Sequence, residues 1–201
     1  MKIKYEIKEG HYDNGNIPYQ KYYANNRLHR EDGPAEIIKY YQNGAIKTED
    51  YYINGKRHRE SKPARISYYE NGNIKYISYY LNDKCHKEDG PACIYYYENG
   101  NVQYEEYYIN GKLHKENGPA VIWYHYDNKG NYTHETKNYY INDNNLTSYY
   151  DKYKNNLTER MIKTQKDIEN LKIMKIVCIE NNKTEFLDLI ESKIIALELS
   201  K

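Results

Sequence analysis

The sequence contains few of the residues that mark secreted, nucleic-acid-binding or membrane proteins. Cysteine occurs three times in 201 residues, a sparse and odd number that implies no disulfide framework, so we expect a reducing, intracellular compartment. The 30 lysines and arginines are balanced by 29 aspartates and glutamates, which argues against a nucleic-acid ligand. No apolar run approaches the roughly 20 residues of a membrane span, and the segment MKIKYEIKEGHYD contains no signal-peptide core.

Phenylalanine and tryptophan are also scarce, with one residue of each, whereas tyrosine occurs 28 times. An AT-rich codon bias would supply phenylalanine as readily as tyrosine, so the excess indicates selection for the hydroxyl group. A ring with a polar tip packs its body against neighbours and leaves the tip in water. The composition therefore predicts a thin structure with much surface, in place of a globule with one thick core.

A repeat of about 28 residues fills the chain from residue 5 to about 150. Proline loops of the type EDGPA are spaced 29, 28 and 28 residues apart, at Pro34, Pro63, Pro91 and Pro119. Histidines follow the same spacing, at His29, His58, His86 and His114. A degenerate start at 12–15 and a fifth tyrosine pair at 139–140 flank four full copies. Such arrays are stabilised by contacts between neighbouring copies and need caps at their ends.

Asn-Gly turns recur within the repeat and predict antiparallel hairpins with type I′ turns. Two sets are present, represented by Asn71-Gly72 and Asn54-Gly55. We expect a first strand of about nine residues, such as 101–109, and a second strand that begins at Lys112 and is interrupted by a bulge or outward loop at 116–119. The predicted fold is mainly β: an elongated, single-layer antiparallel meander of about ten strands, in a domain of residues 1–153.

The segments YYENGN and YYINGKLH resemble the MORN family of repeats, and are most similar to the longer variant of bacteria and large DNA viruses, in which YYxNGKxHRxDGPA recurs. The resemblance covers residues 12–142. The period of 28 residues is longer than the usual unit, and DGPA replaces its G-x-G ending. The resemblance implies a β-meander that serves interaction or scaffolding, in a cytoplasm or, for a viral protein, in the host cytoplasm or virion. Bacterial relatives are often labelled antitoxin-like, which implies an alternative function: binding and neutralising a partner protein.

The composition changes after Tyr153, where tyrosine disappears and Leu, Ile, Lys and Glu recur at helical spacing over 157–180 and 183–199. We predict a helical hairpin domain, residues 154–201, with its second helix started by a capping box of Asn182 and Glu185. Its apolar stripe must be buried. It can cover the last strand of the sheet, or it can pair with a second copy of the chain as a homodimer.

The repeat histidines and the cysteines are the candidate catalytic or metal-binding residues, and both are interpreted as structural. Stacked repeats would place the histidines about 10 Å apart, too far to share one metal ion. Cys85 occupies a position held by Leu28, Arg57 and Leu113 in the other repeats, Cys93 lies at a variable strand position, and neither has a constant His–acid partner. We therefore predict no catalytic, cofactor or metal site, and regard an enzyme with its chemistry in the helical segment as the weakest hypothesis.

Two rows of tyrosines compete as the surface that binds a protein partner. One row shares its face with apolar positions, so we expect it to be packed; it contains Tyr52, Tyr80 and Tyr108, beside Ile46, Ile74 and Val102. The other has charged and polar neighbours; it contains Tyr51, Tyr79 and Tyr107, beside Lys47, Lys75, Gln103, Glu49 and Glu105. Aromatic rings among charges suit a protein interface. The sequence thus predicts a non-enzymatic scaffold that binds a protein through the row of Tyr51, Tyr79 and Tyr107.

Overall fold

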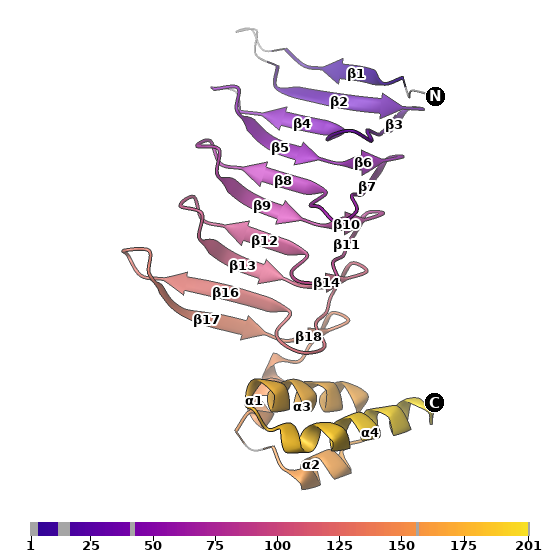
Figure 1. Ribbon diagram of the computed structural model, residues 1–201, viewed down its shortest axis with the longest axis vertical. Helices are drawn as coiled ribbons and strands as arrows, with labels where there is room; N and C mark the ends of the chain where they lie inside the picture. Colours follow the sequence, from indigo (N-terminus) through magenta and orange to yellow (C-terminus); the bar gives the residue numbers. More distant parts are fainter. Residues whose placement is uncertain (1–3, 12–16, 41–42, 156, 201) are drawn as a thin grey trace. The chain divides into compact units, whose positions relative to one another are not determined.

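The computed structural model describes residues 4–11, 17–40, 43–155 and 157–200 (Figure 1). The chain forms two compact units that divide between Gly111 and Lys112. The turn predicted at 12–15 lies outside the described residues.

The first unit contains a single antiparallel sheet whose longer strands follow one another up and down in chain order (Figure 1). These strands are β1 (Glu6–Glu9), β2 (Tyr19–Ala24), β4 (Glu36–Lys39), β5 (Ile46–Asp50), β8 (Arg65–Tyr68), β9 (Ile74–Ser78), β12 (Cys93–Tyr96) and β13 (Val102–Glu106). Each repeat supplies one long hairpin, such as β8–β9, and neighbouring hairpins pair through β5–β8 and β9–β12. This is the meander that the repeat predicts.

The nine-residue strands expected from the sequence are broken into two pieces. In the third repeat, β9 ends at Ser78 and the chain continues as a separate short hairpin. The short strands of this unit are β3 (Arg27–Leu28), β6 (Tyr52–Ile53), β7 (Lys56–Arg57), β10 (Tyr80–Leu81), β11 (Lys84–Cys85) and β14 (Tyr108–Ile109). Hydrogen bonds from the Arg59 and Asp83 amides to the Tyr80 and Arg57 carbonyls join the hairpins β6–β7 and β10–β11. A column of short hairpins therefore accompanies the sheet.

The two sets of Asn-Gly turns have different geometries. In the short hairpins both turn residues are left-handed, with φ of 52° at Asn54 and 82° at Gly55, as a type I′ turn requires. In the long hairpins, Gly72 has a φ of 86°, whereas Asn71 is not left-handed and its Oδ1 accepts a bond from the Asn73 amide. The pairing of β8 with β9 shifts register between Ser67 and Tyr68, just before this turn. The type I′ prediction is therefore correct for the short hairpins and wrong for the long ones, where a bulge takes up the extra residue.

The second unit begins with the strands β15 (Lys112–Leu113), β16 (Val121–Tyr126), β17 (Tyr132–Asn138), β18 (Tyr140–Ile141) and β19 (Asn144–Asn145). Strands β16 and β17 form one hairpin, and the EDGPA-type segment before β16 is a loop. The helices α1 (Thr147–Tyr153), α2 (Glu159–Thr164), α3 (Ile168–Glu180) and α4 (Leu187–Glu198), with the 3₁₀ turn η1 (Thr184–Phe186), complete the unit. The prediction of a mainly β chain with a C-terminal helical hairpin is confirmed, the hairpin being α3–α4.

The helical segment differs in detail from its prediction. Helix α1 lies before the expected boundary at residue 153, and the helical spacing over 157–180 is divided between α2 and α3. The capping box at Asn182 is absent, because Asn182 has a φ of 53° and ends α3 in a Schellman motif. In this motif the Lys183 amide donates to the Cys178 carbonyl at 2.9 Å, and the Asn182 amide donates to the Ile179 carbonyl. Asparagine tolerates the left-handed conformation, so it favours a helix end here over a helix start.

The core of the second unit joins the last short hairpin to the helices. Its largest fully buried side chains are Tyr139, Ile141, Ile162, Leu171, Ile173, Met174, Ile176, Val177, Cys178 and Ile190. The hydroxyls of Tyr139 and Tyr150 both donate to the Glu180 carboxylate at 2.6 Å. The apolar stripe of the helices is thus buried within the unit, where it covers the segment around β18. Among the described helices, none has the length and apolar character needed to cross a membrane.

Candidate interaction surface

The four repeat histidines connect each repeat to the turn of the next one. In every case the ring Nδ1 accepts a hydrogen bond from a backbone amide of the following short hairpin. The pairs are His29 with Asn54 at 3.0 Å, His58 with Asn82 at 3.3 Å, His86 with Asn110 at 3.1 Å and His114 with Asn142 at 3.3 Å. An accepting Nδ1 carries no proton, so these contacts define the neutral Nε2–H tautomer. Within the described ranges, no three or more His, Cys, Asp or Glu side chains form a group that could hold a metal ion.

A basic side chain covers the first tyrosine of the pair in successive repeats. The residue after each repeat histidine is Arg or Lys. In three repeats its cationic group lies over the ring eight positions earlier. The pairs are Arg30 over Tyr22 at 4.1 Å, Arg59 over Tyr51 at 3.7 Å and Lys87 over Tyr79 at 4.1 Å. We call these three pairs the cation-capped row. Cation–π contacts at such distances contribute about 0.5–1 kcal/mol each at exposed sites.

The proline loops hold the two arginines of this row. The Arg30 guanidinium donates to the Pro34 carbonyl and also pairs with Asp32 at 2.8 Å. The Arg59 guanidinium donates to the Pro63 carbonyl at 3.2 Å. Each arginine thus contacts a carbonyl of its own proline loop and a tyrosine ring of the same repeat.

A groove of about 420 Å³ lies between two successive proline loops of the first unit. The capped pair Tyr51–Arg59 lines it together with Ile53 and His58, and the acidic rim residues Glu31, Asp32 and Glu60 add negative charge beside the two arginines. The groove thus combines an aromatic ring, an aliphatic side chain and charges of both signs. Protein interfaces are enriched in aromatic and arginine side chains of this kind.

The predicted row of Tyr51, Tyr79 and Tyr107 overlaps with the cation-capped row at Tyr51 and Tyr79. One of its tyrosines contacts an expected carboxylate, since the Tyr107 hydroxyl donates to Glu105 at 3.3 Å, whereas Glu49 accepts from the hydroxyl of Tyr68, which is outside the row, at 2.8 Å. Burial, together with Glu105, raises the pKa of Tyr107 to about 12. The lysines expected beside this row contact other rings: Lys47 lies over Tyr40 and Lys75 lies over Tyr69.

The other row, Tyr52, Tyr80 and Tyr108, faces the packed side of the first unit. Tyr80 and Tyr108 pack against a small core of Cys85, Ala92 and Cys93. Tyr76 and Tyr95 complete this core, with ring centroids 4.3 Å apart. The isoleucines expected on the packed side do not form it, because Ile46 and Ile74 are 38% and 42% exposed. Small residues and half-buried rings form the packed side instead.

Three positions of each repeat carry different chemistry in each copy, and in the first three copies at least two of the three side chains lie in contact. We call them the variable triad; they lie 13 and 6 residues before the repeat proline and 2 residues after it. The triads are Lys21–Leu28–Glu36, Asp50–Arg57–Arg65, Ser78–Cys85–Cys93 and Glu106–Leu113–Val121. In the first, Lys21 and Glu36 pair at 2.7 Å; in the second, the Arg57 guanidinium contacts the 2%-exposed Asp50 at 2.8 Å. Burial raises the pKa of Asp50, against the opposing effect of Arg57 and Arg65.

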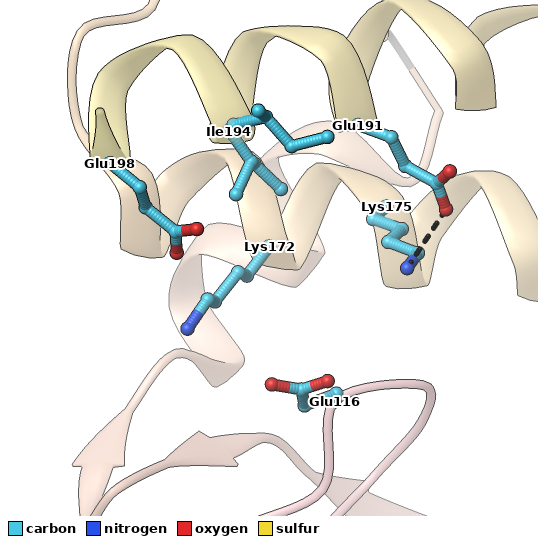
Figure 2. Close-up of a pocket in the computed structure, with 7 residues that line it drawn as sticks. Glu116, Lys172, Lys175, Glu191, Ile194 and Glu198 are labelled. Carbon is cyan, nitrogen blue, oxygen red and sulfur yellow. Dashed lines mark ion pairs between the residues drawn. The ribbon is translucent and has the colours of Figure 1, made fainter. Parts of the chain in front are cut away.

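A second concavity lies within the second unit, between α3, α4 and the last proline loop (Figure 2). It measures about 280 Å³ and is lined by Glu116, Lys172, Lys175, Glu191, Ile194, Ile195 and Glu198. Lys175 pairs with Glu191 across the helices at 3.0 Å. Its lining contains charges of both signs and, apart from Glu116, consists of helical residues that lie outside the repeat, in contrast to the groove at Tyr51.

The cations of the row are the residues that sequence reasoning missed. The signal was present, because His-Arg or His-Lys occurs in all four repeats. Spacing alone could not show that a residue eight positions away returns over the tyrosine ring. In comparisons with known proteins, no family model and no curated sequence matches this chain.

Proposed function

We propose that this protein is a non-enzymatic scaffold that binds a protein partner along the cation-capped row. The observation that carries the proposal is the recurrence of one contact geometry, a basic group over a tyrosine ring at 3.7–4.1 Å, in successive repeats. Arginine and tyrosine are the residues most enriched among the energetically dominant positions of protein interfaces. A periodic row offers a partner several equivalent contacts.

The spacing of the row suits an extended segment of a partner protein. Two strands separate equivalent residues, so the repeat advances by about 10 Å along the sheet. An extended chain covers that distance in about three residues. The mixed charges around Arg30 and Arg59 favour a partner segment with both acidic and basic side chains. The motif resemblance to MORN repeats supports the same function.

The test compares two tyrosine variants of the full chain in affinity capture from cells of the native source. The first, Tyr51→Ser/Tyr79→Ser/Tyr107→Ser, removes the predicted row. The second, Tyr97→Ser/Tyr132→Ser/Tyr149→Ser, removes tyrosines that are 38%, 55% and 41% exposed elsewhere. Circular dichroism and thermal melting establish that both variants are folded.

We expect quantitative mass spectrometry to find a partner that the wild type and the second variant retain and the first variant loses at least about tenfold, the equivalent of 1.4 kcal/mol. If both folded variants retain the partner equally, the row is not the surface that binds it. A partner lost only by the second variant would place the binding surface elsewhere. If the first variant unfolds, Arg30→Gln/Arg59→Gln/Lys87→Gln tests the same surface through its cations.

A further inference from the structure

We propose that Cys85 and Cys93 form an oxidative modification site, which reacts with a low-molecular-weight disulfide to close an intramolecular disulfide bond. The two Sγ atoms lie 3.2 Å apart, on β11 of the short hairpin and on β12 of the sheet. Both thiols are free, and the side chains are 9% and 4% exposed. Bond formation needs an approach to about 2.05 Å, which is within reach of small side-chain rotations.

The placement of the cysteines in the repeat supports a paired role. Two of the three cysteines in the chain occupy facing members of one variable triad. The first two triads contain matched partners of opposite charge, Lys21 with Glu36 and Asp50 with Arg57. In the third triad the matched partners are two thiols. The first three repeats therefore each have a different pairing at the triad, and the pairing in the third repeat is one that oxidation would make covalent.

The surroundings of the pair provide a polarised thiol. The Tyr76 hydroxyl lies 3.5 Å from the Cys93 sulfur and donates toward it. The contact with Cys85 and the hydrogen bond from the Tyr76 hydroxyl lower the pKa of the Cys93 thiol despite its burial. Thiolates are the nucleophiles of thiol–disulfide exchange, so the contact favours reaction at this pair.

The reaction proceeds in two exchanges. One cysteine thiolate attacks a sulfur of the small disulfide, forms a mixed disulfide and releases one small thiolate. The second cysteine thiolate then attacks the protein sulfur of the mixed disulfide and releases the other small thiolate. The two cysteines lose two electrons, the small disulfide gains them, and the two cysteine protons pass to the released thiolates.

The bond would tie the short hairpin β10–β11 to the long strand β12. The hairpin is otherwise held by short two-residue ladders and by turn contacts, such as the bond from Asn110 to His86. Cross-linking restricts the unfolded chain, so the oxidised protein should melt at a higher temperature. The site acts independently of the proposed partner surface, which does not include these cysteines.

The experiment treats the full-length protein with oxidised glutathione, then alkylates and digests it with trypsin. Lys87 lies between the two cysteines, so cleavage after Lys84 and Lys87 separates peptide 85–87 from peptide 88–112. We expect these peptides to stay linked until reduction, the accessible thiols of the denatured protein to fall from three to one, and the melting temperature to rise by several degrees. Cys178→Ser should behave like the wild type, with no free thiol left.

The control Cys85→Leu/Cys93→Val carries the residues of the equivalent positions Leu113 and Val121 and should show no oxidant-dependent shift in melting temperature. Slow access of glutathione to the buried thiols could hide the reaction. The equilibrium is therefore reached from two starting materials, the reduced folded protein and protein refolded in the presence of oxidised glutathione. Three alkylatable thiols at equilibrium from both directions would overturn the proposal. So would linkage through Cys178 or between two chains, or a stable glutathione adduct without closure of the pair.

Discussion

The two units of this chain are stabilised in different ways. In the first unit the fully buried residues are small or polar, such as Ala35, Ala64 and Ser78, and most tyrosines are half-buried. In the second unit a cluster of Ile, Leu, Val and Met side chains is almost completely excluded from water. A single-layer sheet cannot enclose a thick core, so its stability depends on hydrogen bonds and ring contacts between neighbouring repeats. The helices supply the aliphatic burial that the repeats lack.

Removing the helices should have the largest effect on this balance. Deletion of residues 157–201 would expose Ile141 and Tyr139, which are 0% and 2% exposed in the full chain. We expect aggregation or dimerisation, measured by light scattering after size exclusion, because an apolar strand segment loses its cover. A soluble monomer with an unchanged melting curve would show that the helices are a separate module and not a cap. The full-length chain, measured alongside, tests the alternative that its helices form a homodimer.

Breaking the charged triad should destabilise the first unit strongly. Asp50→Ala leaves the Arg57 guanidinium half-buried without its carboxylate partner, which should cost about 3–5 kcal/mol in urea unfolding. The double variant Asp50→Ser/Arg57→Leu installs residues found at the same triad positions of other repeats, Ser78 and Leu113. It should recover most of the loss. If the double variant is no more stable than the single one, residues from the triad of one repeat cannot replace those of another.

A repeat histidine tests the hydrogen bonds between repeats. His86→Ala removes the acceptor of the Asn110 amide and part of the packing at the turn, and we expect a loss of about 1–2 kcal/mol in the free energy of unfolding. His86→Asn is the matched control, because its Oδ1 can occupy the place of Nδ1, and it should retain part of that stability. Equal losses of stability in both variants would mean that packing of the ring, and not the hydrogen bond to Nδ1, stabilises this site.

The smallest expected effect is a pH dependence at Glu106. Burial raises the pKa of this carboxyl above its ordinary value of about 4.3, so the folded chain binds a proton more readily than the unfolded chain. Its contribution to stability is therefore present below about pH 4.3 and is lost as the pH rises through the raised value. We expect Glu106→Gln to have a higher urea midpoint than the wild type at neutral pH, and the difference to vanish below about pH 4. The exposed control Glu70→Gln should show no such difference.

These comparisons also show why some predictions from the sequence succeeded and others did not. The repeat period and the Asn-Gly turns predicted the meander, because both depend on local chemistry. The break between β9 and β10 was missed, since it depends on bonds such as that of the Tyr79 amide to the Ala92 carbonyl, which the chain reaches only after the proline loop. The Asn182 capping box failed because asparagine is found both at helix starts and, in the left-handed conformation that Asn182 adopts, at helix ends.

The sequence by itself determined the periodic architecture: strand direction, turn positions and the equivalence of residues between repeats follow from a 28-residue period and from residues that adopt positive φ. The tertiary structure decided which residues meet. Only folding brings Arg59 over Tyr51, and places the Cys85 sulfur at 3.2 Å from Cys93. The physical reason is that both contacts cross a reversal of the chain, the short hairpin β6–β7 between Tyr51 and Arg59 and the proline loop between Cys85 and Cys93, so they depend on how the chain returns. Periodicity fixes where equivalent residues recur, and the path of the loop fixes what they touch.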